Sequence, residues 1–146
     1  MTKHVMISIR GLQEYEGVDN DSIEFVTAGT LTSIKDGFNL SYAESELTGM
    51  QGTVTSFDII PNRVVLTRTG PVCSEMVFEA GRRHLSLYQT PYGSMEVGIR
   101  AKKMRCTMDE HGGELEIVYS IDIDHAMAGE NRFLIKVRES KSTVPQ

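Results

Sequence analysis

Arg68 is the residue of this sequence that could most directly do chemistry. It alternates with Val64 and Leu66 in a run with a period of two, so it shares their face, which we expect to be the core side. A buried guanidinium needs acceptors for its fixed set of donors. Arg68 could therefore clamp the carboxylate or phosphate of a small ligand, or form a structural ion pair that closes one end of the fold.

The side chains expected around Arg68 are two carboxylates and two phenols. Glu44 and Glu75 are the predicted acidic partners, and the hydroxyls of Tyr42 and Tyr88 are the predicted polar neighbours. A structural ion pair is the first interpretation of such an arginine, and a ligand clamp is the second.

A second candidate site is the aromatic segment 88–93, Tyr-Gln-Thr-Pro-Tyr-Gly. Pro91 cannot donate to a ladder, so it marks a strand end or an edge. The side chains before and after it could line the mouth of a barrel and stack on a ligand, although tyrosines at such places more often pack a corner. The predicted ligand-binding set is Arg68, Tyr42, Glu44, Glu75, Tyr88, Thr90 and Tyr92.

Motifs that would indicate catalysis, a metal or a cofactor are not found. The histidines, which are His4, His84, His111 and His125, show neither HxH nor HExxH spacing. The sequence also lacks a GxSxG nucleophile motif and a GxxxxGK[ST] phosphate loop. It therefore assigns no catalytic residue, no metal and no cofactor.

Composition narrows the classes of partner and compartment. The chain has 146 residues and a net charge of -5, from 15 basic and 20 acidic residues. This balance disfavours binding to nucleic acid, and no apolar run reaches the roughly 18 residues of a membrane span. The alternating N-terminus is unlike a signal peptide, so we predict a cytoplasmic protein in which Cys73 and Cys106 are free thiols.

The dominant period of the sequence is two, which is typical of half-buried strands. Turn signals recur every 8 to 12 residues, a spacing that favours an all-β barrel or sandwich, and helical periodicity of useful length is not found. The pattern predicts one domain over residues 1–139, with a flexible tail at 140–146. About ten strands are expected, from the eleven runs 5–10, 23–34, 38–42, 52–60, 64–68, 76–81, 85–89, 95–99, 104–108, 114–125 and 132–138.

The last two runs should form a hairpin around Ala126 to Glu130, with Gly129 supplying a positive φ. Residues that lie opposite each other must share a face, so the register pairs odd residues with odd residues. Ile123 opposite Phe133 satisfies this condition and places Asp124 opposite Arg132. Such opposite-charge pairs contribute roughly 0.2 to 1 kcal/mol each.

The order and spacing of several short motifs resemble the YwiB-like family of small bacterial proteins over about residues 5–137. The resemblance implies a calycin-type barrel, the architecture of lipocalins and fatty-acid-binding proteins, and it implies no activity. The motifs that carry it are Leu40-Ser41-Tyr42 with Glu44, Gly49, the run from Val65 to Gly70, Met76, Phe78, Gly81, and the segment from Tyr88 to Gly93.

The sequence thus predicts an all-β protein, a single antiparallel, mostly up-and-down barrel of about 8 to 10 strands. The first functional hypothesis is the binding of a small, partly apolar or anionic molecule in the barrel. The alternative is a filled barrel that acts through its surface or as a homodimer. An enzyme whose site is dispersed over several strands is the least favoured class. Nucleic acid and membranes are not expected partners.

Overall fold

The computed structural model contains ten strands that form one antiparallel sheet closed into a barrel. It describes residues 2–14, 21–45, 51–70, 73–90, 93–123 and 126–140, and it describes the backbone alone for 12–14, 21–23, 87–90, 93–95 and 126–128. The strands are β1 (Thr2–Glu14), β2 (Asp21–Ile34), β3 (Gly37–Ala43), β4 (Val54–Ile60), β5 (Arg63–Thr69), β6 (Ser74–Glu79), β7 (Arg83–Thr90), β8 (Gly93–Cys106), β9 (Gly112–Ile123) and β10 (Ala126–Glu139).

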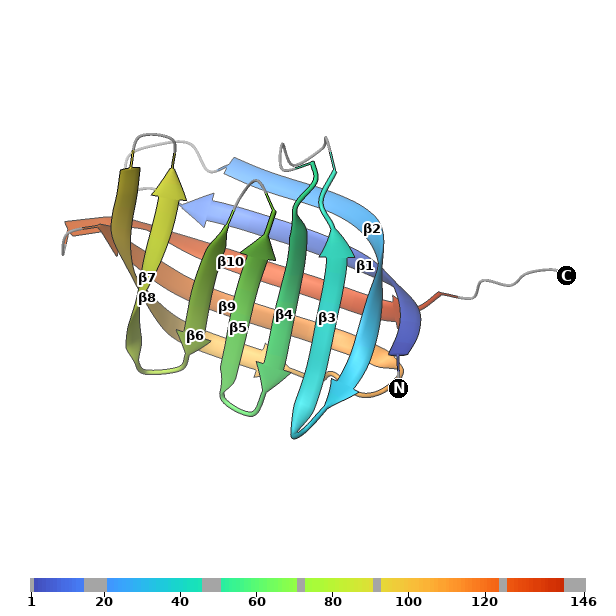
Figure 1. Ribbon diagram of the computed structural model, residues 1–146. Helices are drawn as coiled ribbons and strands as arrows, with labels where there is room; N and C mark the ends of the chain where they lie inside the picture. The colour runs from blue at the N-terminus through green and yellow to red at the C-terminus, as the bar shows by residue number, and fades with distance from the viewer. Residues whose placement is uncertain are drawn as a thin grey trace, which may run out of the picture.

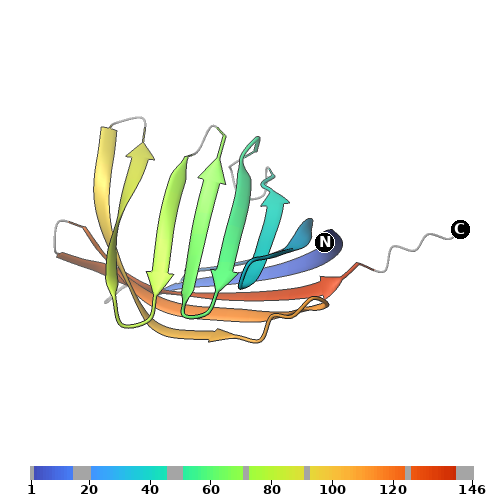
Figure 2. The same ribbon diagram turned by 60° about the horizontal axis from the view of Figure 1, so that its bottom comes forward.

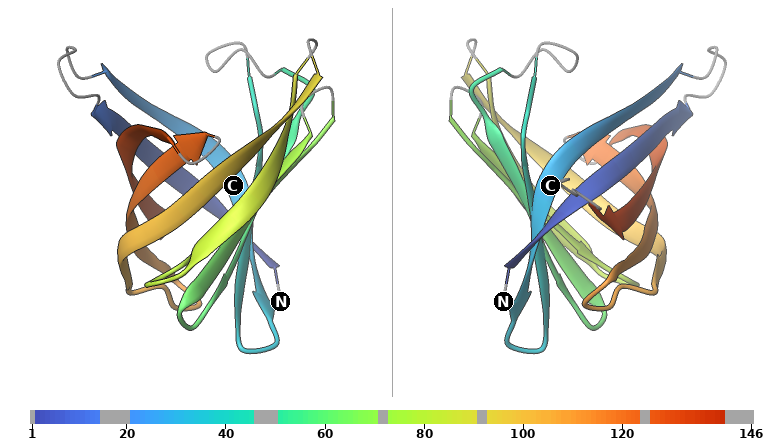
Figure 3. Two further views of the ribbon diagram at one scale, coloured as in Figure 1. Left: turned by 90° about the vertical axis from the view of Figure 1, so that its left-hand side faces the viewer. Right: turned by 90° about the vertical axis from the view of Figure 1, so that its right-hand side faces the viewer.

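Each strand pairs with its neighbours in the sequence, and β1 pairs with β10 to close the barrel. This confirms the predicted up-and-down order. In Figure 1, β3 to β7 form a front layer, and β1, β9 and β10 cross behind them. The long strands β2 and β8 bend from one layer into the other, as the turned views also show (Figures 2 and 3).

The barrel has an upper and a lower end in the orientation of Figure 1. At the upper end, β3 and β5 finish and β4 and β6 begin. At the lower end lie the turns at residues 35–36 and 61–62, where Asp36 and Asn62 adopt positive φ values of 64° and 66°. Aspartate and asparagine tolerate this conformation better than other residues with a Cβ atom, which explains their position in these tight turns.

Alternate residues of every strand point inward and form the core. Fully buried side chains fill the middle of the barrel, among them Leu40, Leu66, Phe78, Ile99, Leu115, Ile117 and Ile135. The rings of Phe78, Tyr119 and Phe133 lie in mutual contact, with centroids 4.9 to 6.4 Å apart. This cluster joins the front layer to the back layer.

The predicted register of the last hairpin is wrong, although odd residues do pair with odd residues between Asn131 and Val137. Phe133 lies opposite Ile117, and Ile123 lies opposite Ala126. The chain reverses earlier than predicted, so β10 already begins at Ala126. Gly129 belongs to the ladder next to a register shift and not to the turn. The proposed partner Asp124 lies outside the described residues, and Arg132 is opposite Val118.

The sequence pattern predicted a separate strand at residues 104–108, and this prediction is wrong. Residues 93–106 are one strand, β8, with a β-bulge between Ala101 and Lys103. Before the bulge the odd residues Val97, Ile99 and Ala101 are buried. After it the even residues Met104 and Cys106 take the inward side, opposite Ile117 and Leu115. The extra residue therefore reverses the alternation that the prediction relied on.

Candidate functional site

A row of polar side chains crosses the inner face of the front layer near the upper end. Tyr42 lies opposite Thr55, Thr55 opposite Arg68, and Arg68 opposite Ser74, so the row runs across β3, β4, β5 and β6. Arg68 has a side chain that is 16% exposed, which agrees with the inward face predicted from its spacing. We call Tyr42, Glu44, Thr55 and Arg68 the Arg68 cluster.

Glu44 is the acidic member of the Arg68 cluster, and its side chain is 1% exposed. The Thr55 hydroxyl donates to Glu44 Oε2 at 2.5 Å. Arg68 Nε lies 3.9 Å from the same oxygen, within range of an ion pair but beyond a hydrogen bond. Burial, together with the charge of Glu44, raises the pKa of the Tyr42 phenol well above its ordinary value. Tyr42 is therefore a protonated donor at neutral pH.

Four buried polar atoms have no hydrogen-bond partner within the described part of the protein. They are Arg68 Nε, Ser74 Oγ, Ser86 Oγ and Asn131 Oδ1. Ser86 lies opposite buried Val97, and Asn131 lies opposite buried Tyr119, so both face the interior. Buried polar atoms in native proteins nearly always have a partner, whether protein, water or ligand. The interior therefore offers donors and an acceptor without protein partners on β5, β6, β7 and β10.

The seam between β6 and β7 lies beside two of these atoms. Among the described residues, the two strands share one register pair, Ser74 with Tyr88, whereas β5 and β6 share six. Ser74 and Ser86 flank this seam from either side. Two of the four atoms without partners, those of Ser74 and Ser86, therefore belong to the pair of neighbouring strands that shares the fewest register pairs among the described residues.

The structure places the other predicted site residues differently. Glu75 is exposed on the outer face, opposite Thr67, so the prediction that it partners Arg68 is wrong. The cause is the alternation of β6, which turns Ser74 and Met76 inward. Tyr88 and Thr90 belong to β7, but their side chains are outside the described residues, as is all of Tyr92.

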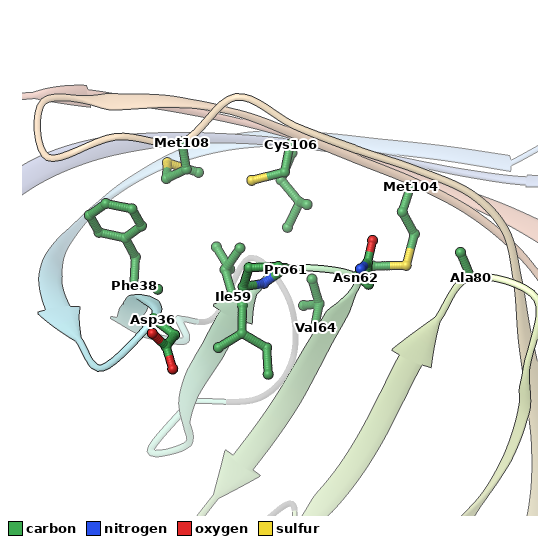
Figure 4. A pocket seen from close by; sticks show the side chains of 13 residues that line it. Asp36, Phe38, Ile59, Pro61, Asn62, Val64, Ala80, Met104, Cys106 and Met108 are labelled. Atoms are coloured by element: carbon green, nitrogen blue, oxygen red, sulfur yellow. The ribbon is translucent and has the colours of Figure 1, made fainter.

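A second region, at the lower end, encloses a pocket of about 370 Å³ that we call the Cys106 pocket. Figure 4 shows Met104, Cys106 and Met108 on one side of it and Phe38, Ile59 and Val64 on the other. These side chains come from β3, β4, β5, β8 and the segment after β8. The sequence analysis assigned none of these residues to a site. Met104 and Cys106 could not be placed there, because they face inward only after the β8 bulge.

A buried carboxylate on the outer face of β9, Glu116, shows how a fully paired glutamate looks in this protein. Arg132 donates to it through both Nε and Nη2, the Nε bond measuring 2.8 Å, and Arg105 Nη2 lies 3.4 Å from its other oxygen. Hydrogen bonding to Arg132 holds the pKa of Glu116 below its ordinary value of 4.5. A second outer pair joins Arg83 and Asp122 through two hydrogen bonds of 2.6 and 2.9 Å.

The described residues contain no group of three or more His, Cys, Asp or Glu side chains placed to hold a metal ion. Cys73 and Cys106 are exposed free thiols, as predicted. The same part of the chain includes no helix of the length and apolarity needed to cross a membrane.

Comparison with known proteins places the chain in a family. Residues 7–135 match a domain of unknown function, DUF1934. The chain belongs to the DUF1934 family. This DUF1934 protein is also 24% identical, over 119 residues and 82% of each chain, to the uncharacterised β-barrel protein YwiB of Bacillus subtilis strain 168. The crystal structure of B. subtilis YwiB matches it with a TM-score of 0.85 at 20% identity, covering 96% of this chain and 94% of the other.

The relationship to YwiB confirms the resemblance noted in the sequence, and the structural match confirms the barrel. YwiB is itself described as uncharacterised. The comparisons therefore establish family and fold, and any function has to be argued from the residues.

Proposed function

We propose that this DUF1934 protein binds a small, partly apolar molecule inside its barrel, with an anionic or other hydrogen-bond-accepting group directed at Arg68. The observation that carries the proposal is the set of buried polar atoms without a protein partner on the inward faces of β5, β6, β7 and β10. Arg68 Nε and the hydroxyls of Ser74 and Ser86 can all donate to such a group. A ligand would give them the partners that burial requires.

The interior also offers apolar contacts for the rest of such a ligand. Phe25 and Tyr42 lie edge to face, with centroids 6.3 Å apart, near the Arg68 cluster. Sites that combine an apolar lining with a few placed polar groups are typical of small-molecule binding. A calycin-like role follows by analogy, and the cytoplasmic location stays a prediction from the sequence.

A filled barrel that acts through its surface or as a homodimer is the second candidate. The observation that favours it is the ion pair between Arg68 and Glu44, which leaves the cluster close to neutral. Under this reading Arg68 is structural, and buried water completes the hydrogen bonds of the serines and Asn131. The two candidates differ in whether an added acceptor binds at Arg68.

The test uses 8-anilinonaphthalene-1-sulfonate, an aromatic anion that fluoresces when it is shielded from water. The informative pair of variants is Glu44→Gln and Arg68→Met/Glu44→Gln, because both lack the buried carboxylate and they differ at Arg68 alone. We expect Glu44→Gln to bind the probe at least as tightly as wild type, since a repelling charge is gone. We expect the double variant to bind it at least tenfold more weakly than Glu44→Gln.

The matched control is Arg100→Met, which makes the same change at an exposed position of β8. Binding in this variant should equal that of wild type. Equal affinity of the probe for Glu44→Gln and for the double variant, with both shown to be folded by circular dichroism, would contradict a role for Arg68. Absence of saturable binding, with a dimer detected by light scattering, would instead favour the second candidate.

A further inference from the structure

The Cys106 pocket lies at the end of the barrel opposite the Arg68 cluster. Phe38 and the turn residue Pro61 line it at the lower end, whereas Tyr42 and Arg68 stand near the upper ends of β3 and β5. Leu40 and Leu66, which are 0% exposed, occupy the inward positions between them on the same strands. A layer of filled core thus separates the two regions.

We propose that the Cys106 pocket is a second binding site, independent of Arg68, for a small, neutral and largely apolar molecule. Its volume of about 370 Å³ is near the lower limit of roughly 300 Å³ for sites that hold small organic ligands. The size therefore suits a compact ligand and not an extended lipid or a peptide.

The lining of the pocket determines the class of ligand. Its walls are formed mainly by apolar side chains, among them Phe38, Ile59, Val64, Met104, Met108 and Leu115. None of the described residues that line it is lysine or arginine, and its one carboxylate is Asp36. A ligand carboxylate or phosphate would have no cation to pair with here and would meet a like charge. A neutral ligand avoids both costs.

The side chains contributed by β8 and the segment after it suit a site that adapts to its ligand. Met104 and Met108 are partly buried and pack against the core. Their unbranched thioethers can change rotamer to follow the shape of an apolar molecule. Cys106 between them is an exposed thiol, so the pocket opens to solvent at a group whose accessibility can be measured.

The experiment measures whether a neutral probe shields Cys106 from alkylation. Wild-type protein is treated with iodoacetamide, with and without saturating N-phenyl-1-naphthylamine, and the modification of each cysteine is followed by peptide mass spectrometry. Cys73 is the internal control, because it is an exposed thiol that does not line the pocket. We expect the probe to slow alkylation of Cys106 at least fivefold and to leave the rate at Cys73 unchanged.

Equal rates at Cys106 with and without the probe would overturn the proposal, as would equal slowing of both cysteines. Equal protection by 8-anilinonaphthalene-1-sulfonate would overturn the assignment to neutral ligands. These outcomes are measured on wild-type protein, so they do not depend on a variant that folds.

A pair of variants locates the bound probe. Ala80→Phe places a ring at the lining of the pocket, and Ala28→Phe makes the same change at an exposed position of β2. We expect the fluorescence titration of N-phenyl-1-naphthylamine to weaken at least tenfold in Ala80→Phe and to match wild type in Ala28→Phe. Equal affinities in the two folded variants would place the probe elsewhere and overturn the proposal.

The Arg68→Met/Glu44→Gln variant separates this site from the function proposed above. Protection of Cys106 by the neutral probe should persist in that variant, because the core layer lies between the two regions. Loss of protection there, with the fold intact, would mean that the two regions form one site.

Discussion

Glu44 and Glu116 are both buried glutamates, 6% and 3% exposed as whole residues, but the fold provides them with different partners. Glu116 sits on the outer face, where Arg132 of β10 donates two hydrogen bonds to it and Arg105 of β8 forms an ion pair with it at 3.4 Å. Glu44 lies inside the barrel, where Thr55 donates to it and Arg68 stays 3.9 Å away with its own Nε unpaired.

The two pairs differ in the hydrogen bonding of their arginines. A carboxylate with all of its partners is part of the framework, and its arginines, about half exposed, remain solvated by water. In the interior pair, by contrast, Arg68 Nε is buried and has no hydrogen-bond partner within the described residues. This contrast supports the proposal that a ligand binds at Arg68, and it favours a structural role for Glu116.

The largest loss of stability is expected when Arg68 is replaced and Glu44 is kept. Arg68→Met leaves Glu44 buried without its cation, which should cost about 3 kcal/mol of unfolding free energy. Arg68→Met/Glu44→Gln should regain most of that loss, because no unpaired charge remains. Urea denaturation at neutral pH measures both variants. A double variant as unstable as the single one would show that packing of Arg68, and not its charge, stabilises the barrel.

A smaller loss of stability is expected when Glu116, on the outer face, is replaced. Glu116→Gln removes charge-assisted hydrogen bonds but leaves arginines that water can solvate, so we expect a loss of about 1 to 2 kcal/mol at pH 7. The same urea titration measures it. A loss larger than that of Arg68→Met would reverse the comparison between the inner and the outer pair.

The contribution of Glu116 should depend on pH in a definite direction. Its pKa in the folded protein is lowered below 4.5, chiefly by hydrogen bonding to Arg132. A lowered carboxyl pKa stabilises the folded state above the ordinary pKa, and that contribution is lost as the pH falls through the folded value. The gap in urea midpoint between wild type and Glu116→Gln should therefore narrow from pH 7 to pH 3. A gap of constant width would contradict this assignment.

The smallest loss of stability is expected when Arg105, the more exposed of the two arginines at Glu116, is replaced. Arg105 is 60% exposed and lies 3.4 Å from Glu116. Exposed ion pairs contribute roughly 0.2 to 1 kcal/mol, so Arg105→Ala should lower the free energy of unfolding by an amount in that range. This loss should be smaller in high salt, which screens the ion pair. Thermal unfolding at two salt concentrations checks both points, with Arg100→Ala as the control for loss of an exposed arginine.

The alternation of apolar residues predicted an all-β protein, the family resemblance favoured a barrel over a sandwich, and the alternation failed wherever the ladder is irregular. The order of the strands, and their number to within one, followed from a period of two and from turn residues such as Asp36 and Asn62. The last register failed because β10 already begins at Ala126, within the segment that was expected to be the hairpin loop, and a register shift follows between Met127 and Gly129. The bulge after Ala101 likewise depends on pairing across the barrel, which the sequence of one strand does not contain.

The candidate site was predicted in part for the same reason. Arg68 could be assigned to the interior because Val64 and Leu66 fix the parity of β5. Ser74 and Ser86 were missed, since a serine in a strand carries no signal of burial. Alternation along β6, counted from Met76 and Phe78, could have identified Ser74 as inward and Glu75 as outward.

The closure of the barrel through β1 and β10 also bears on how the chain reaches this structure. Val5 pairs with Glu139, so one edge of β1 has no partner until almost all later strands exist. Pairings between such distant segments form slowly, and an unpaired strand edge can join to another chain. During synthesis, β1 would thus have an open edge for longer than any other strand, and the charges of Lys3 and Arg10 on it would help to keep neighbouring nascent chains apart.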